Sequence, residues 1–171
     1  MLFRSVRVEP GDLFLFFGSF HRVKEENGHY RYVRHSGDFY QDNDIHAIFG
    51  YMQVGKIITD PEEAKKLFWH PHACEDRIHN PTNAIYLPAE RLSFRPDLPG
   101  CGLFQYDERR VLTFEGHPKA TWKPNGVYMP DAIVGKRKNS SKGPGVFYCG
   151  IWQELALKET PEAERWAVSL F

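Results

Sequence analysis

A short stretch of the sequence, residues 69–83, concentrates the side chains that are able to do chemistry. The side chains that we single out are, in order, Trp69, His70, His72, Cys74, Asp76, Arg77, His79, Asn80 and Asn83. Imidazole and thiolate groups are ligands that zinc prefers, whereas imidazole and amide groups also recognise the edges of bases. The stretch therefore predicts a functional loop whose chemistry has several interpretations.

In the interpretation that we favour, this loop forms a pocket for a nucleotide. We expect its ligand-binding residues to be Trp69, His70, His72, Arg77, His79 and Asn83, together with Trp122 from a later loop. The histidines and Asn83 would contact polar base edges, Trp69 would stack, and Arg77 would bind phosphate. Trp69 and Trp122 are both expected to be exposed, because each lies in a polar, proline-containing loop.

Three other interpretations of the same loop remain open. A zinc site would use His70, His72, Cys74 and His79, although their spacing matches no familiar zinc signature. An enzyme acting on a base or nucleotide would use His70 or His72 as a general base near neutral pH. In a purely structural loop, these polar side chains would satisfy the backbone of the loop itself. We expect a binding module without a cofactor in preference to an enzyme.

A basic run forms a second candidate contact with phosphate. It contains Lys136, Arg137, Lys138 and Lys142, between Gly135 and Gly145. A charged run between glycines is also typical of a solvated loop, so both interpretations are kept.

Composition limits the class of protein. The 171 residues fit one domain, residues 1–171, and the formal net charge of zero excludes a large basic face that binds duplex by charge alone. The three cysteines form no CxxC pair, which favours a reducing compartment. No signal peptide and no apolar run of membrane-spanning length is visible, so we expect a cytoplasmic protein with no membrane partner.

The strand patterns predict a sheet in which the functional loop is a connection. The apolar run Leu13–Phe17 is expected to be a core strand buried on both faces, with partners on both sides. Asn27-Gly28 predicts a β-hairpin with arms at 19–25 and 29–34. A fourteen-residue strand is predicted for Ile45–Ile58, with Gly50 and Gly55 available for bends or bulges.

Two helices are expected to pack on this sheet. Asp60 followed by Pro61, and Thr160 followed by Pro161, each combine a capping side chain with proline at the first helical position. A late strand is expected at 146–157. The predicted fold class is α+β: mainly an antiparallel, strongly bent sheet or partial β-barrel with two short helices.

Four segments together resemble a known family. They are Gly11–Gly18, Ile48–Gly55, His70–His72 and Asn83–Tyr86. Their order and sequence are similar to the third of the nucleotide-modification-associated domain families, bacterial and phage proteins linked to DNA base modification. The resemblance implies recognition of DNA or a modified nucleotide. It also implies a partner, either a base-modifying enzyme or the upstream segment that family members carry and this chain lacks, which would make it the C-terminal part of a longer architecture.

A more distant similarity concerns the PUA-like barrels of the ASCH and EVE groups. It rests on a Gly-Asp strand followed by Gly50-Tyr51-Met52-Gln53-Val54. This second resemblance implies a barrel whose cleft binds RNA or modified bases.

Overall fold

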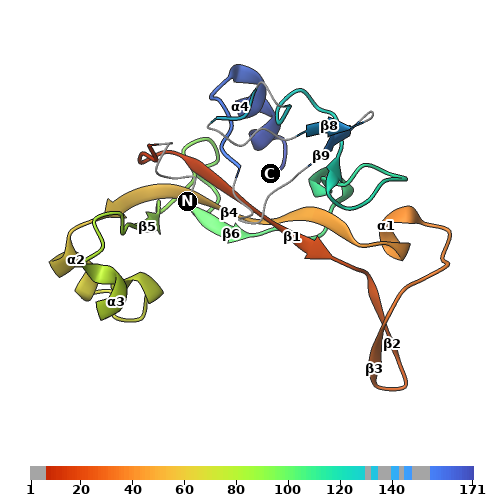
Figure 1. The fold of residues 1–171 in the computed structure, drawn as a ribbon, viewed down its shortest axis with the longest axis horizontal. Helices are drawn as coiled ribbons and strands as arrows, with labels where there is room; N and C mark the ends of the chain where they lie inside the picture. The colour runs from red at the N-terminus through yellow and green to blue at the C-terminus, as the bar shows by residue number, and fades with distance from the viewer. Residues whose placement is uncertain (1–6, 130–131, 135–139, 143–144, 148–154) are drawn as a thin grey trace. The chain divides into compact units, whose positions relative to one another are not determined.

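The computed structural model describes residues 7–129, 132–134, 140–142, 145–147 and 155–171 (Figure 1). The chain divides into two compact units: the first contains Phe16–Phe49 and Phe104–Phe171, and the second contains Arg7–Leu15 and Gly50–Leu103. No helix within the described ranges is long and apolar enough to cross a membrane.

The fourteen-residue strand β4 (Ile45–Ile58) is confirmed and is the central strand of the largest sheet. The strand order is β1-β4-β5, with β6 also paired to β4; β1 is Leu13–Phe20, β5 is Ile85–Pro88 and β6 is Cys101–Leu103. Pairing of β4 with β5 shifts register at Gly55, where a bulge was expected. A Cβ there would lie 2.6 Å from the Cα of Ala89, so only glycine fits this approach.

The prediction for β1 is wrong in two respects. Among the described strands it pairs only with β4, so it is not flanked on both sides. Phe17 packs against Trp122 on one face, with ring centroids 5.1 Å apart. Phe16 and Phe20 point to the other face and are more than 40% exposed. Among the described side chains, the aromatic ring that both of them contact on this face is that of Phe49. The strand with both faces buried is β4, because adjacent residues, which point to opposite faces, are both buried at 47–48, 50–51 and 53–54.

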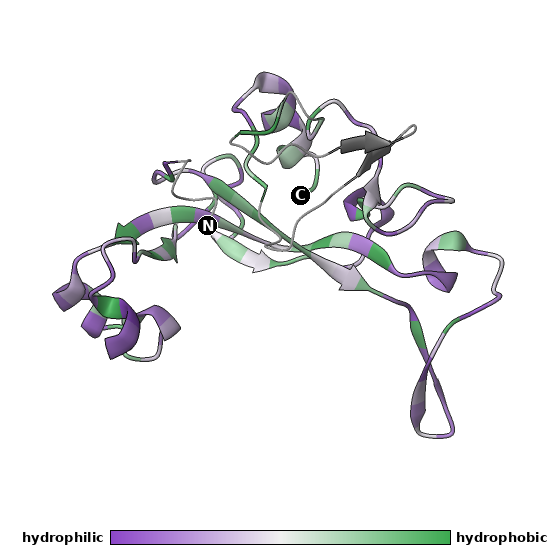
Figure 2. Ribbon diagram, in the orientation of Figure 1, coloured by the Kyte–Doolittle hydropathy of each residue, from purple (hydrophilic) through white to green (hydrophobic). Residues whose placement is uncertain are grey.

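The predicted hairpin is confirmed as β2 (Val23–Glu26) and β3 (His29–Tyr32). Asn27 and Gly28 have φ values of 54° and 76°, as a tight two-residue hairpin turn requires. All eight strand residues are exposed, and their only strand partners among the described residues are one another. The hairpin projects from the end of β1, and most of its length is hydrophilic (Figures 1 and 2).

Both predicted helices are confirmed: α2 (Pro61–Lys65) is capped by Asp60 and α4 (Pro161–Val168) by Thr160. The described residues also contain four single-turn elements, which are α1 (Phe39–Asp42), η2 (Pro71–Ala73), α3 (Glu75–Ile78) and η3 (Glu108–Arg110). Four residues are too short for a helical hydrophobic period, which is why the sequence pattern did not indicate α1 and α3.

A separate three-stranded sheet has the order β7-β9-β8, with β7 at Thr121–Trp122, β8 at Ser140–Lys142 and β9 at Gly145–Phe147. The predicted late strand is thus present at its start, while residues 148–154 lie outside the described residues. Mixed α/β structure with antiparallel sheets is confirmed. The described strands form no closed barrel, so the strongly bent sheet and the partial, PUA-like barrel stay predictions.

Candidate nucleotide site

Residues 69–83 bring several of the predicted ligand-binding residues together around His72. The backbone N–H of His72 donates to Nδ1 of His70 at 3.1 Å, which caps η2. Arg77 donates from Nη1 to Nε2 of His72 at 3.1 Å, and the Asn83 amide donates to the His72 carbonyl at 2.9 Å. Four of the residues predicted to bind a ligand therefore lie in one hydrogen-bonded network, and their role in binding stays a prediction.

The imidazoles of His70 and His72 have defined tautomers. A guanidinium has donors only, so Nε2 of His72 accepts and the ring proton lies on Nδ1, which is buried without a hydrogen-bond partner in the described part of the chain. Nδ1 of His70 accepts from the backbone, which leaves its proton on Nε2. Burial, and then the neighbouring His72, lower the pKa of His70 and favour this neutral form. In each ring the unprotonated nitrogen already accepts a hydrogen bond, Nδ1 in His70 and Nε2 in His72. This geometry therefore does not favour either ring as a general base.

The loop also presents exposed groups. Trp69 is 65% exposed, as expected, and its ring lies 5.5 Å from that of His70. His79 lies apart from this network, 3.8 Å from a carboxylate oxygen of Glu75 on the next turn. Cys74 is exposed. Within the described ranges, no three His, Cys, Asp or Glu side chains gather into a group that could hold a metal ion.

Trp122 corrects one expectation of the sequence. It is 2% exposed, contacts Phe17 and Tyr128, and donates Nε1–H to Nδ1 of His46 at 3.0 Å. Its loop forms the short strand β7, which turns the indole into the core; the expected exposure is wrong. Of the predicted phosphate-binding residues, Lys136, Arg137 and Lys138 lie outside the described residues, as does the side chain of Lys142.

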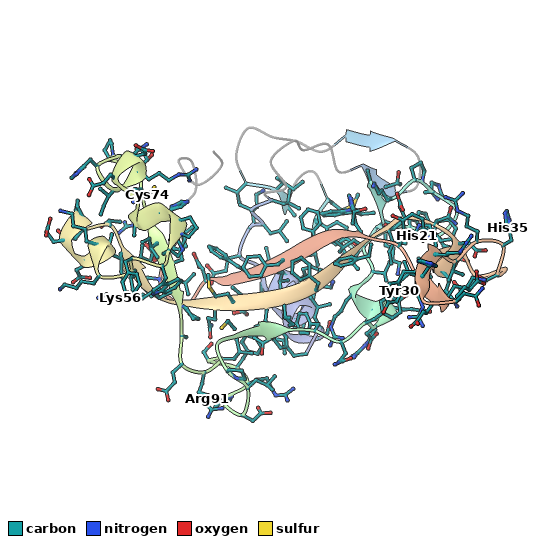
Figure 3. All side chains as sticks on the ribbon, turned by 90° about the horizontal axis from the view of Figure 1, so that it is seen from below. His21, Tyr30, His35, Lys56, Cys74 and Arg91 are labelled. Atoms are coloured by element: carbon teal, nitrogen blue, oxygen red, sulfur yellow. The ribbon has the colours of Figure 1, made fainter. Side chains whose placement is uncertain are left out.

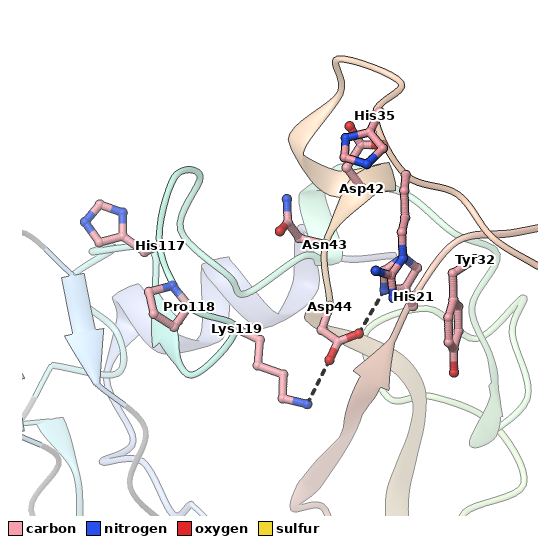
Figure 4. Close-up of a pocket in the computed structure, with 10 residues that line it drawn as sticks. His21, Tyr32, His35, Asp42, Asn43, Asp44, His117, Pro118 and Lys119 are labelled. Carbon is pink, nitrogen blue, oxygen red and sulfur yellow. Dashed lines mark hydrogen bonds and ion pairs between the residues drawn. The ribbon is translucent and has the colours of Figure 1, made fainter.

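A pocket that the sequence did not indicate lies at the base of the hairpin, within the first unit (Figure 4). Its volume is about 830 Å³, within the range of small-molecule sites. Four separate segments line it, with the residues His21, Tyr32, Arg34, His35, Asp42, Asn43, Asp44, His117, Pro118 and Lys119.

His21 has a hydrogen-bond acceptor at each of its two ring nitrogens in this pocket. Its Nδ1 lies 2.9 Å from a carboxylate oxygen of Asp44, and its Nε2 lies 3.0 Å from the carbonyl oxygen of Val33. Both partners are acceptors, so the ring satisfies both only when both nitrogens carry a proton. The Val33 carbonyl and then the Asp44 carboxylate raise the pKa of His21 accordingly. The ring of Tyr32 packs against this imidazolium, with centroids 4.5 Å apart.

The two carboxylates of the pocket are already engaged. Asp44 binds His21 through one oxygen, and its other oxygen lies 3.4 Å from Nζ of Lys119. Asp42 accepts hydrogen bonds from the backbone N–H groups of residues 36 and 37 at 2.8 and 3.1 Å. These bonds lower the pKa of both carboxyls, so both are ionised. Arg34 forms no ion pair with any described residue, which leaves its guanidinium available to an anionic ligand.

The sequence did carry one signal for this pocket. Residues 21–35 contain four of the arginines and lysines, three of the eight histidines and only two acidic residues, in a chain of zero net charge. Asp44 and Lys119 come from distant segments that only the fold brings near the hairpin.

Replacing His21 with asparagine is expected to lower the free energy of unfolding by about 1–2 kcal/mol at pH 5.5, and by less at pH 9. The folded state holds the His21 proton more tightly than the unfolded chain, in which the pKa of histidine is 6.5. The resulting stabilisation is fully present below pH 6.5 and is lost as the pH rises through the raised pKa of the folded state. Urea unfolding of both proteins across this range measures the difference.

The matched control is His29→Asn on the exposed strand β3, which should change the free energy of unfolding by no more than about 0.5 kcal/mol. An equal loss of stability at both pH values for His21→Asn would contradict a doubly protonated ring.

One comparison with known proteins identifies the chain. The family model of nucleotide modification associated domain 3 matches residues 3–163, which include the loop, the hairpin and the pocket. No curated protein and no solved structure matches the chain. The chain therefore belongs to the nucleotide modification associated domain 3 family, and its role is associated with nucleotide modification.

Proposed function

We propose that the chain is a recognition module for nucleotides, as part of nucleic acid or in modified form, and that the pocket at the base of the hairpin is its binding site. The observation that carries this proposal is the gathering of His21, Arg34 and Lys119 in one pocket, whose two carboxylates are already engaged by other groups. An anionic ligand meets a surplus of positive charge there.

The three cations have different roles. The donors of His21 are both used by the protein, so its charge attracts an anion without a direct bond. Arg34 can bind a phosphate with two parallel N–H donors, as guanidinium groups commonly do. Lys119 donates from Nζ to Oγ of Ser19 at 3.0 Å and also to Asp44, and it adds a third positive charge to the pocket.

Tyr32 supports binding of a base beside the phosphate. Its side chain is 59% exposed although the ring packs on His21, so part of the ring surface stays open to solvent. Stacking of one base on such a ring is worth about 1–3 kcal/mol. Phosphate binding together with a stacking surface favours a nucleotide over a simple inorganic anion.

Binding of a fluorescent twelve-nucleotide DNA strand, followed by anisotropy, tests the site. Arg34→Ala with Lys119→Ala is expected to weaken binding at least tenfold. Two lost phosphate contacts should also reduce the slope of log affinity against log salt by about 1.4, at 0.7 for each contact of a single strand. The matched control is Lys56→Ala with Arg95→Ala, two exposed cations of the second unit that pair with carboxylates.

The loop at residues 69–83 remains a proposed second contact, and the same assay tests it. His72→Ala with Trp69→Ala should weaken binding if the loop contacts the strand, and unchanged binding would remove it from the site. If the loop variant alone weakens binding and the Arg34 and Lys119 variant does not, the pocket is not the nucleotide site.

A further inference from the structure

The β2–β3 hairpin has two chemically different faces. Directly opposite residues of an antiparallel pair lie on the same face, and Val23 pairs with Tyr32 while Glu25 pairs with Tyr30. Val23, Glu25, Tyr30 and Tyr32 therefore share one face, which we call the aromatic face although it also carries the Glu25 carboxylate. The opposite face carries Lys24, Glu26, His29 and Arg31. One face of the hairpin thus presents two tyrosines, and the other is mainly charged.

The aromatic face is not explained by folding. Tyr30 is 75% and Tyr32 59% exposed, and no other described strand pairs with the hairpin. An isolated two-stranded hairpin is only marginally stable in water, and these exposed rings do not give the hairpin the burial that normally stabilises such strands. Figure 3 labels Tyr30, near the tip of the hairpin, and His21, at its base. Tyr32 packs against His21 on one side only, and large rings that stay this exposed are typical of a contact surface.

The face is continuous with the pocket. Tyr32 and Arg34 line the pocket, and Tyr30 lies two residues before Tyr32 on the same side of β3, about 6.6 Å away along the strand. His21 fixes the base of the hairpin by bonding both the Val33 carbonyl and Asp44. A ligand that begins in the pocket therefore meets a second ring in the direction of the hairpin tip.

The hairpin strands carry two cations and two carboxylates, and the arginines that flank them make the segment basic. On its charged face, Glu26 lies 2.7 Å from Nζ of Lys24 and 3.8 Å from Nε of Arg31, so one carboxylate is shared by two cations. Together with Arg22 and Arg34, the hairpin segment is basic in a neutral chain.

From these observations we infer that the hairpin is a stacking arm for single-stranded nucleic acid, with successive bases on Tyr32 and Tyr30. The inference rests on the proposed function and specifies its ligand as a strand of at least two nucleotides. Unpaired bases expose faces that rings can stack on, as in strand-binding sheets whose aromatic side chains stack two or three bases. The bases of a duplex stack on one another and offer only edges.

The test compares thymidine monophosphate, a twelve-nucleotide thymidine strand and a twelve-base-pair duplex as ligands, by calorimetry and anisotropy. Tyr30→Thr removes the ring but keeps a residue that favours strands. It should weaken binding of the twelve-nucleotide strand about 5- to 150-fold and leave binding of the monophosphate unchanged. Tyr30→Phe should restore strand binding, and His29→Thr on the opposite face should have little effect.

The two proposals fail differently. If the strand binds no tighter than the monophosphate and Tyr30→Thr has no effect, the stacking arm is wrong while the pocket stands. If monophosphate binding is insensitive to Arg34→Ala with Lys119→Ala, the pocket itself is wrong. Preference for the duplex would overturn the single-stranded ligand, and self-association of the wild type that Tyr30→Thr abolishes would identify the face as a dimer contact instead.

Discussion

Replacing Trp122 with alanine is expected to lower the free energy of unfolding by about 3–5 kcal/mol. The indole is 2% exposed, and its edge-on contacts with Phe17 and Tyr128 have centroid distances of 5.1 and 5.4 Å. Alanine would leave a cavity among these rings and would also remove the Nε1–H that donates to His46. Urea unfolding followed by far-ultraviolet circular dichroism measures the loss without depending on tryptophan fluorescence.

Trp69→Ala is the matched control, since the same side chain is removed from an exposed position. It should change the free energy of unfolding by no more than about 0.5 kcal/mol. Trp122→Phe separates two contributions at the buried site: it keeps most of the apolar packing and loses the hydrogen bond to His46, so its effect should lie between those of the two alanine variants. Equal losses for Trp69→Ala and Trp122→Ala would contradict the burial seen here.

The contrast between these tryptophans shows what the sequence does and does not determine. Both lie in polar, proline-containing segments, so local composition predicts exposure for both. Trp69 lies in the loop after α2, and its side chain is exposed. Trp122 joins β7 and packs on Phe17, a residue more than one hundred positions away. Its burial depends on a long-range contact that no local pattern contains.

Features with local causes were predicted well. Asn27-Gly28 determines the hairpin because both residues adopt positive φ, and Asp60 before Pro61 begins a helix through its own side chain. The His72 network lies within the fourteen residues from His70 to Asn83, so its members are close in sequence as well as in space. The pocket joins His21 to Asp44 and Lys119, and its assembly depends on how β1, β4 and the later loop meet.

Removing the guanidinium of Arg110 is the second substitution with a large expected effect. Arg110 is 8% exposed; Nε and Nη2 donate to the Leu170 carbonyl at 2.8 and 2.5 Å, and Nη1 donates to the Gln105 carbonyl at 3.0 Å. The guanidinium carbon also lies 4.2 Å from the ring centroid of Phe104. The buried guanidinium of Arg110 thus joins Leu170 to Gln105, which precedes η3.

Arg110→Met preserves much of the side-chain volume but leaves two carbonyl groups without these donors. The buried Leu170 carbonyl loses its donors at a cost of about 1–3 kcal/mol, whereas Gln105 is exposed and its carbonyl adds less. With the lost cation–π contact over Phe104, we expect a total loss of about 2–4 kcal/mol in urea unfolding. Arg109→Ala provides the control, because Arg109 is exposed and its ion pair with Asp107 is screened by water, so its removal should cost much less. If Arg110→Met were as mild as Arg109→Ala, the Leu170 and Gln105 carbonyls would have to be satisfied by water, and the C-terminal residues would not depend on Arg110 for their position.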